Sequence, residues 1–162
     1  MLVIFIVLTI IIICFAGVLL FGAPYLPTLK PQIETALTLA QLKPGQTLIE
    51  LGCGDGRVVL AAAKKGIKVV GYELNPILAL TAWLRTRHYR RQVKIVWGNF
   101  WLKDWPPADA IFVFLLYRYM VKLDKKCMRY KFKPLTLVSF AFQIPGHEPA
   151  KFERGLYLYY YR

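Results

Sequence analysis

The sequence predicts a doubly wound α/β domain around a mostly parallel β-sheet, because short β-prone segments alternate with helical segments. The first strand, Thr47–Leu51, is apolar and leads through a glycine-rich turn into a helix over Gly56–Lys65. A second strand, Lys68–Glu73, ends on an acidic residue. Ala110–Leu116 is a continuous apolar run, typical of a strand buried on both faces of a sheet. The order of strand, turn, helix, strand and acid is typical of sheets that bind nucleosides.

The other elements are assigned from periodicity and turn residues. Pro31–Leu42 has apolar residues at helical spacing. Asn75 before Pro76 provides an N-cap for a helix that extends to about Arg87. Tyr117–Tyr130 is a basic amphipathic segment and is predicted to be a helix. Three more strands are expected at Val93–Trp97, Leu135–Phe142 and Leu156–Tyr161. The alternation favours one domain over residues 47–162.

The glycine-rich turn, Glu-Leu-Gly-Cys-Gly-Asp-Gly over residues 50–56, distinguishes between two classes of nucleoside ligand. A dinucleotide fingerprint of the form G-x-G-x-x-G needs glycine at position 57 or 59, where Arg57 and Val59 stand. The motif instead carries Glu50 two residues before its first glycine. A carboxylate there suits a ligand with an ammonium group and would repel a pyrophosphate. Glu73, at the end of the second strand, is placed to accept hydrogen bonds from ribose hydroxyls.

Leu2–Phe21 is a run of apolar residues without a charge. At ~1.5 Å per residue, a helix of this length crosses a hydrocarbon core of ~30 Å. A cleaved signal peptide would need a basic residue before a shorter apolar run, and a lipoprotein at Cys14 would need a small residue where Ile13 stands. We therefore expect a retained transmembrane anchor over residues 2–21. A linker over residues 22–46, which contains the short amphipathic helix, follows it.

The charge of the chain lies entirely on the C-terminal side of the apolar run. The chain carries 22 Lys+Arg against 9 Asp+Glu, a formal net charge of +13. Under the positive-inside rule, this predicts a single-pass membrane protein whose catalytic domain is cytoplasmic. The charge also favours contact with anionic lipid headgroups or with nucleic acid. The three cysteines include no C-x-x-C pair and indicate neither a disulfide framework nor a metal site.

These motifs together resemble the class I S-adenosylmethionine-dependent methyltransferases. Within that class, five segments in one order are similar to the membrane-anchored family of lysine methyltransferases of the ATP synthase c subunit and the adenine nucleotide translocase. The segments are GAPYLPT, ELGCGDGR, GYELNP, GNFW and FAFQIPGHEP. The resemblance implies a Rossmann-like fold with S-adenosylmethionine as the cofactor. Because the stretch before Leu156 is too short for another full helix, the domain is expected to be shortened at its C-terminus, which puts the usual final hairpin in doubt.

The resemblance also implies the composition of the cofactor site. Tyr25, Pro27 and Thr28 would close over the cofactor. Asn99 would recognise the adenine amino group, and Phe100 would pack against the ring. The complete predicted cofactor site comprises Tyr25, Pro27, Thr28, Glu50, Gly52, Gly54, Asp55, Gly56, Arg57, Glu73, Asn75, Asn99 and Phe100.

The activity implied is methyl transfer to a protein lysine, with another membrane protein as the expected substrate. The alternatives are methyl transfer to a small molecule, a lipid or RNA on the same fold, and a membrane module that binds the cofactor without turnover. The end of the fourth strand lacks the Asn-Pro-Pro-Tyr or Asp-Pro-Pro-Tyr signature of base methylation, so nucleic acid is the less expected partner. Tyr117 and Glu148 are candidates for handling an acceptor amine, and no catalytic residue is assigned.

Overall fold

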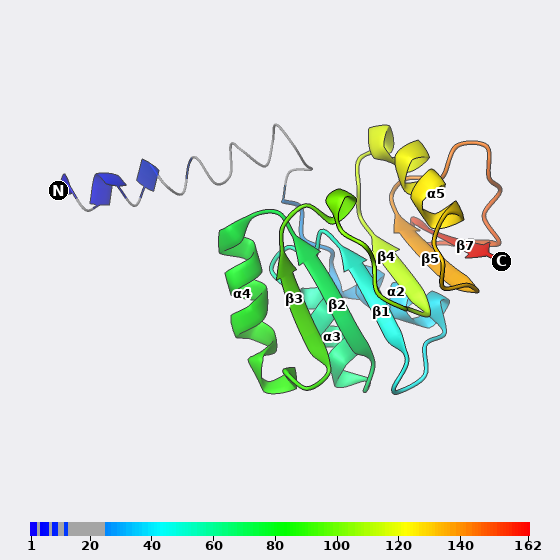
Figure 1. Ribbon diagram of the computed structural model, residues 1–162, viewed down its shortest axis with the longest axis horizontal. Helices are drawn as coiled ribbons and strands as arrows, with labels where there is room; N and C mark the ends of the chain where they lie inside the picture. The colour runs from blue at the N-terminus through cyan, green and yellow to red at the C-terminus, as the bar shows by residue number, and fades with distance from the viewer. Residues whose placement is uncertain (3, 7, 10–11, 13–24) are drawn as a thin grey trace.

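The computed structural model of the protein describes residues 1–2, 4–6, 8–9, 12 and 25–162. Within these residues, seven strands form one sheet in the order β3-β2-β1-β4-β5-β7-β6 (Figure 1). The strands are β1 (Thr47–Leu51), β2 (Lys68–Glu73), β3 (Val93–Trp97), β4 (Ala110–Val113), β5 (Leu135–Phe140), β6 (Lys151–Glu153) and β7 (Leu156–Tyr161). Strands β1 to β5 are parallel, and β7 pairs antiparallel with both β5 and β6. The predicted doubly wound, mostly parallel sheet is therefore confirmed.

The order of the strands reverses next to β1. This strand pairs with β2 on one side and with β4 on the other, so the chain winds outward from the centre in both directions. In open α/β sheets, ligands bind outside the carboxyl ends of the strands at such a point. The glycine-rich turn over residues 50–56 begins at the end of β1, so the fold places it there.

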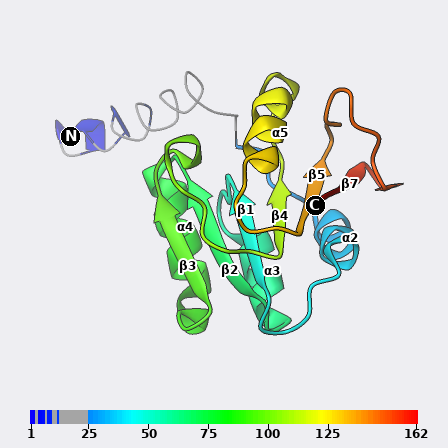
Figure 2. The same cartoon turned by 45° about the vertical axis from the view of Figure 1, so that its right-hand side comes forward.

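Helices cover both faces of the sheet (Figure 2). Helices α2 (Lys30–Ala40), α3 (Arg57–Lys64) and α4 (Pro76–Thr86) pack on one face, and α5 (Met120–Met128) packs on the other. Successive strand residues alternate between two apolar clusters, one under each helical layer, as the two-residue period of a strand requires. Short 3₁₀ helices form at η1 (Arg87–Tyr89), η2 (Phe100–Leu102) and η3 (Tyr117–Tyr119).

Most element boundaries agree with those that the sequence predicts, and β1, β2, β3 and β7 match them fully. Asn75 caps α4 as expected, because its Oδ1 accepts hydrogen bonds from the backbone N–H groups of Ile77 and Leu78. Strands β4 and β5 are shorter than predicted, since residues 114–116 and 141–142 leave the sheet and line a cavity at its carboxyl edge. The helix predicted over residues 117–130 is divided into η3 and α5.

The final hairpin, which the sequence analysis put in doubt, is present. Strands β6 and β7 pair across Arg154 and Gly155, which have φ angles of 50° and 80°. Positive φ at both central residues is the geometry of a two-residue hairpin turn. The sequence does not indicate the first strand of this hairpin, because β6 has only three residues, too few to show an alternating pattern. The shortening falls instead between β5 and β6, where residues 141–150 contain no helix.

The helix assigned to the linker over residues 22–46 is part of the domain core. On α2, Ile33, Ala36 and Leu37 are buried in the apolar cluster that α3 and the sheet complete. The anchor predicted over residues 2–21 lies largely outside the described residues. Among the residues that are described, no helix is both long and apolar enough to cross a membrane.

Gly56 fixes the close packing of α3 against α4. It has a φ of 79°, and a Cβ at this position would lie 2.8 Å from the Cβ of Ala82. Gly56→Ala should therefore lower the free energy of unfolding by roughly 2–4 kcal/mol, because overpacking adds to left-handed backbone strain. Gly45→Ala is the matched control: Gly45 has a φ of 89° with no heavy atom within 4 Å, so strain alone should cost about 1–2 kcal/mol. Urea unfolding measures both, and equal losses would contradict the packing role.

Candidate active site

A cavity of about 550 Å³ lies at the carboxyl ends of β1 to β5. Residues 25–28, the glycine-rich turn and the chain segments that leave β2, β3, β4 and β5 line it. All residues of the predicted cofactor site line this cavity except Gly56, which packs against α4 instead. The structure thus brings together predicted residues from four separate parts of the sequence. Their individual contacts with a cofactor stay predictions.

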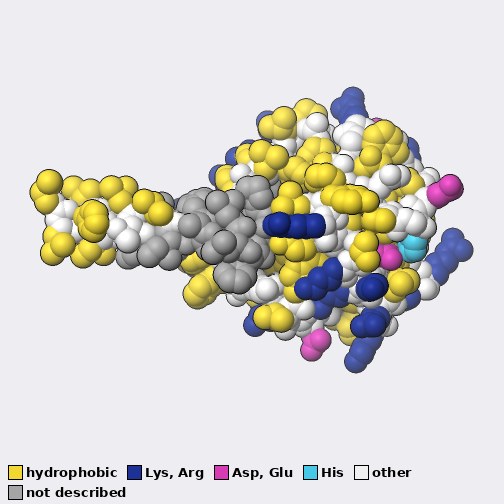
Figure 3. Space-filling view, turned by 90° about the horizontal axis from the view of Figure 1, so that it is seen from above, with side chains coloured by type: hydrophobic (Ala, Val, Ile, Leu, Met, Phe, Trp, Pro, Cys, Tyr) yellow, Lys and Arg dark blue, Asp and Glu magenta, His cyan; other side chains and the backbone are white. Residues whose placement is uncertain are grey.

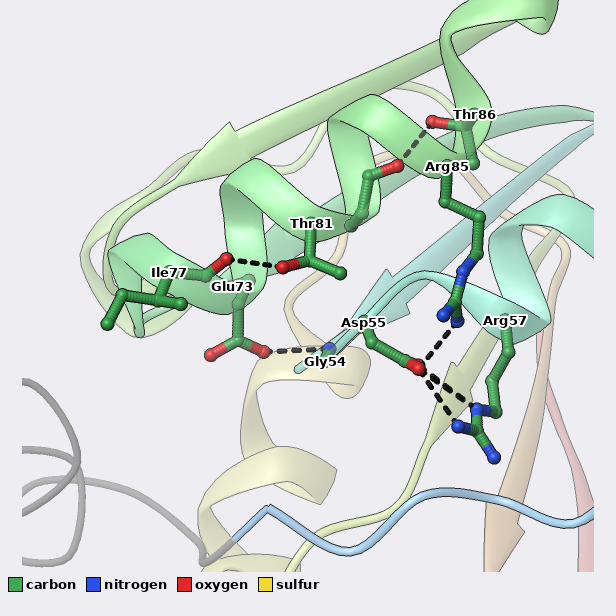
Figure 4. A network of polar contacts seen from close by, with 9 residues as sticks. Gly54, Asp55, Arg57, Glu73, Ile77, Thr81, Arg85 and Thr86 are labelled. Carbon is green, nitrogen blue, oxygen red and sulfur yellow. Dashed lines mark hydrogen bonds and ion pairs between the residues drawn. The ribbon is translucent and has the colours of Figure 1, made fainter. Parts of the chain in front are cut away.

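Glu73 holds the glycine-rich turn in place (Figure 4). Its Oε2 accepts a hydrogen bond from the backbone N–H of Gly54 at 2.8 Å, and its Oε1 accepts one from Asn75 N–H at 2.8 Å. Burial raises the pKa of Glu73, and the backbone hydrogen bonds only partly offset this shift. Each carboxylate oxygen can accept more than one hydrogen bond. Glu73 can therefore order the turn and still accept hydrogen bonds from a ribose diol.

Glu50 is a buried carboxylate with an unpartnered oxygen. The residue is 4% exposed, and its Oε2 has no hydrogen-bond partner in the described part of the chain. Burial, and then the charge of Glu73, raises the pKa of Glu50 well above its ordinary value. A buried acid without a partner lowers stability. A ligand with an ammonium group would supply the missing partner, so this position fits the amino-acid end of S-adenosylmethionine.

Asp55 links the glycine-rich turn to α4 and to the N-terminal side of the domain. It accepts hydrogen bonds from the guanidinium groups of Arg57 and Arg85 (Figure 4). Burial would raise the pKa of Asp55, but the two guanidinium groups lower it. Burial, and then the charge and hydrogen bond of Asp55, raises the pKa of Tyr25. A Cβ on Gly54 would lie 3.0 Å from the Tyr25 ring. The ring therefore packs against the glycine-rich turn and covers it.

The chain after β3 supplies two aromatic rings beside polar groups. The Oδ1 of Asn99 accepts a hydrogen bond from Trp101 N–H at 2.9 Å and caps η2. The Phe100 and Trp101 rings lie 4.6 Å apart between centroids. Asn75 is fully buried, and its Nδ2 has no partner among the described residues. A purine ring would therefore meet an aromatic surface and amide groups at this end of the cavity.

The ends of β4 and β5 form an apolar part of the cavity, and the predicted site includes none of its residues. Ala141 has a φ of 71° directly after β5, so the chain leaves the strand in a left-handed conformation there. The signal that could have identified these residues is their position, since they lie at or just beyond the carboxyl end of a predicted strand. The residues are Phe114, Leu115, Leu116, Tyr119 and Phe142.

Tyr117 and Glu148, the two residues considered for the acceptor amine, do not line this cavity. Tyr117 is exposed, with its ring 6.4 Å from that of Phe142, and Glu148 is also exposed. The acids among the described lining residues are Glu50, Asp55 and Glu73, and no histidine accompanies them. The described residues also include no cluster of three or more His, Cys, Asp or Glu that could hold a metal ion.

Comparison with known proteins places this geometry in a family. Residues 50–151 match the family described as the ANTKMT methyltransferase domain. The chain belongs to this family. The lysine N-methyltransferase of the ATP synthase c subunit from Homo sapiens is 32% identical to this family member over 130 residues, which are 78% of this chain and 54% of that protein. The protein-lysine N-methyltransferase of Saccharolobus islandicus is 34% identical over 131 residues, 78% of this chain and 81% of that protein.

A solved structure agrees with this assignment. The RNA methyltransferase from Salinibacter ruber, crystallised with S-adenosyl-L-homocysteine, is similar with a TM-score of 0.75 and 27% identity, over 84% of this chain and 92% of that chain. The predicted family, the Rossmann-like fold and S-adenosylmethionine as the cofactor of the class are confirmed. This ANTKMT-family chain spans about half the length of the human relative.

Proposed function

We propose that this chain is an S-adenosylmethionine-dependent protein-lysine N-methyltransferase that acts on another membrane protein. The observation that carries the proposal is the division of the cavity into two parts. Acids and amides line the part at β1, β2 and β3, whereas the part at β4 and β5 is aromatic and aliphatic. The first part fits a charged nucleoside, and the second fits the long apolar stem of a lysine side chain. Membership of the family supports the same substrate class.

The cofactor, when bound, would supply a methyl group on a positively charged sulfur; as the acceptor nitrogen bonds to the methyl carbon, the carbon–sulfur bond would break and the sulfur would leave as a neutral thioether. Glu50 would hold the cofactor's ammonium group and Glu73 its ribose diol, so the cofactor would be fixed on both sides of its sulfur. Tyr25 would cover the turn from the solvent side. Positioning the two reactants and excluding water supply much of the catalysis in such a displacement.

The acceptor nitrogen must lose a proton before it can attack, because an ammonium group has no lone pair. The aromatic and aliphatic side chains at β4 and β5 favour the neutral amine, since burial lowers the pKa of a lysine. Within the described lining of that part, Tyr119 is the residue with a polar side-chain group. We therefore assign the deprotonation to desolvation of the substrate lysine and assign no general base.

We also propose that residues 2–21 anchor the domain to the cytoplasmic face of a membrane. The support is the uncharged apolar run together with the +13 charge that follows it. The full-length protein should remain in the membrane pellet after carbonate extraction, and its domain should be digested only by a protease on the cytoplasmic face. Release by carbonate would contradict the anchor, and protection from that protease would reverse the orientation.

Membranes supplied with methyl-tritiated S-adenosylmethionine and the full-length protein provide the test of the activity. We expect the label in a membrane protein, recovered as methylated lysine after acid hydrolysis. The matched control is the same protein carrying Glu73→Ala, which should transfer far less label. Label in RNA would favour an RNA methyltransferase. This second candidate function is supported by the likeness to the Salinibacter ruber enzyme. Label in lipid would favour a lipid methyltransferase, and no label in any fraction would favour a binding module without turnover.

A further inference from the structure

Helix α4 is apolar on both of its faces. Leu78, Ala79 and Ala82 point into the domain and are buried. On the opposite side Leu80, Trp83 and Leu84 are 57%, 54% and 47% exposed. A surface helix normally carries polar residues on its outward face, and a helix that is apolar all round is normally covered. The outer face of α4 therefore has the composition of a covered surface.

A second exposed tryptophan lies beside this face. Trp97, at the end of β3, is 66% exposed, and its Nε1 donates a hydrogen bond to the carbonyl of Leu74, next to the N-cap of α4. Val93 and Ile95, which share one face of the strand with Trp97, pack against the cluster that α4 covers. β3 is the edge strand of the sheet, and α4 lies along that edge (Figure 1). Leu80, Trp83, Leu84 and Trp97 are called the α4–β3 surface below.

The charge around the α4–β3 surface has one sign. From Leu74 to Lys103 the sequence contains no acidic residue, whereas it contains six basic ones, Arg85, Arg87, Arg90, Arg91, Lys94 and Lys103. Arg87, four positions after Trp83, continues the outward side of α4, and the exposed Arg90 and Arg91 follow it. Arg85 pairs with Asp55, and Lys94 lies on the strand face opposite to that of Trp97. Figure 3, which looks down on the carboxyl edge, shows basic side chains next to apolar ones over the domain. Tryptophan and leucine flanked by arginine is the composition of an interfacial membrane surface.

The connection to the N-terminal run places this surface close to a membrane. The Tyr25 hydroxyl lies at Asp55, and Asp55 also pairs with Arg85 of α4. Only residues 22–24 separate Phe21 from Tyr25, and four residue spacings cover at most about 14 Å. If residues 2–21 are in a bilayer, the headgroups begin within that distance of Tyr25, and α4 is the helix that is tied to Tyr25 through Asp55.

We infer that the α4–β3 surface lies on the bilayer, with its tryptophan and leucine side chains at the level of the headgroups and its arginines on anionic lipid. Because Asn75 and Leu78 of the same helix border the cavity, this contact would fix the cavity next to the membrane surface. The site would then meet lysines at the membrane ends of integral proteins at high effective concentration. The inference rests on the membrane placement of the proposed function and does not depend on methyl transfer.

Quenching of tryptophan fluorescence by lipid tests this contact. The full-length protein is added to vesicles of phosphatidylcholine and phosphatidylserine whose acyl chains carry bromine, with unbrominated vesicles as the reference. We expect the brominated lipid to quench the wild-type protein. The paired change Trp83→Phe with Trp97→Phe should remove most of this quenching, since it keeps both positions apolar and leaves the other tryptophans. Trp105→Phe is the matched control and should keep the quenching, because Trp105 is buried.

Substitution of the arginines tests the contact with anionic lipid independently. Arg87→Glu combined with Arg90→Glu and Arg91→Glu should reduce quenching in vesicles with phosphatidylserine, and added salt should have the same effect on the wild-type protein. Quenching that persists in the Trp83 and Trp97 variant, or none in the wild type, would overturn the inference. Shielding of Trp83 that depends on protein concentration without lipid would also overturn it, because a second copy of the chain would then cover the face. Transfer of label to a soluble lysine peptide, measured separately, reports on the proposed activity alone.

Discussion

Glu73→Ala should weaken the binding of S-adenosylmethionine by on the order of a hundredfold or more, measured by calorimetry. The carboxylate has two roles that the alanine removes together. It would accept hydrogen bonds from the ribose diol, and it already accepts those of Gly54 and Asn75. Losing two charge-assisted bonds to a ligand costs several kcal/mol, and each 1.4 kcal/mol is about tenfold in affinity.

The second role of Glu73 adds to the expected loss. Without the carboxylate, the backbone N–H groups of Gly54 and Asn75 lose their acceptor, and the turn that faces the cofactor is no longer held. Glu153→Ala, which removes an exposed carboxylate in β6, is the matched control and should bind as the wild type does. An unchanged affinity in Glu73→Ala would remove Glu73 from the cofactor site. Tighter binding of NADH than of S-adenosylmethionine would have the same consequence.

One part of the predicted cofactor site could be identified from the sequence because its residues lie close together along the chain. Residues 50–56 and Glu73 belong to one strand-turn-helix-strand unit, so their spacing predicts both the fold and the ligand class. The role of Gly56 was not predictable in the same way. The presence of Ala82 next to it depends on how α4 packs on α3, which a pattern within the turn does not contain.

The apolar half of the site was not predictable, because it exists only after the sheet has formed. Phe114 and Phe142 each read as the continuation of an apolar strand, and the structure shows that they leave the sheet instead. Tyr117 is a candidate for handling the acceptor amine because it directly follows the fourth apolar run. Tyr119, two residues later, lines the cavity because the 3₁₀ helix η3 turns the chain between them. Apolarity alone does not distinguish a strand end from a cavity wall.

The features behind the proposed membrane contact illustrate the same limit. The apolar run over residues 2–21 is readable from the sequence, since its length and lack of charge are local properties. The outward position of Trp83 is not, because an apolar residue on α4 can point to either side. Only the burial of Ala79 and Ala82 shows which face of the helix is outside.

Glu50→Gln should change cofactor affinity and protein stability in opposite directions. Because the carboxylate would pair with the cofactor's ammonium group, the amide should lower the affinity for S-adenosylmethionine by roughly 10- to 100-fold near neutral pH. The ligand-free protein, in contrast, holds Glu50 buried without a partner for its Oε2. Where the carboxyl group is ionised, removing this buried charge should raise the free energy of unfolding by on the order of 1 kcal/mol or more.

The pH dependence gives the sign of the stability effect. The pKa of Glu50 in the folded protein is raised well above its unfolded value, mainly by burial and then by Glu73. A raised pKa means that the folded state holds the proton more tightly. The stability from Glu50 is therefore fully present below the unfolded pKa and is lost as pH rises through the folded pKa. The glutamine variant does not titrate, so its advantage over the wild type should be absent at acidic pH and should grow as pH rises.

Urea unfolding of the ligand-free proteins across this pH range measures the stability difference, and calorimetry measures the affinity. In the wild type, affinity should increase with pH as Glu50 loses its proton, and binding should release that proton to the buffer. In Glu50→Gln, both effects should be weaker. A variant that is less stable than the wild type at every pH would show that the carboxylate's contacts, including that with the Val59 backbone N–H, outweigh the cost of burying it. An affinity that is unchanged and equally dependent on pH would show that the ammonium group binds elsewhere, and the unpartnered oxygen at the end of β1 would then lie outside the cofactor site.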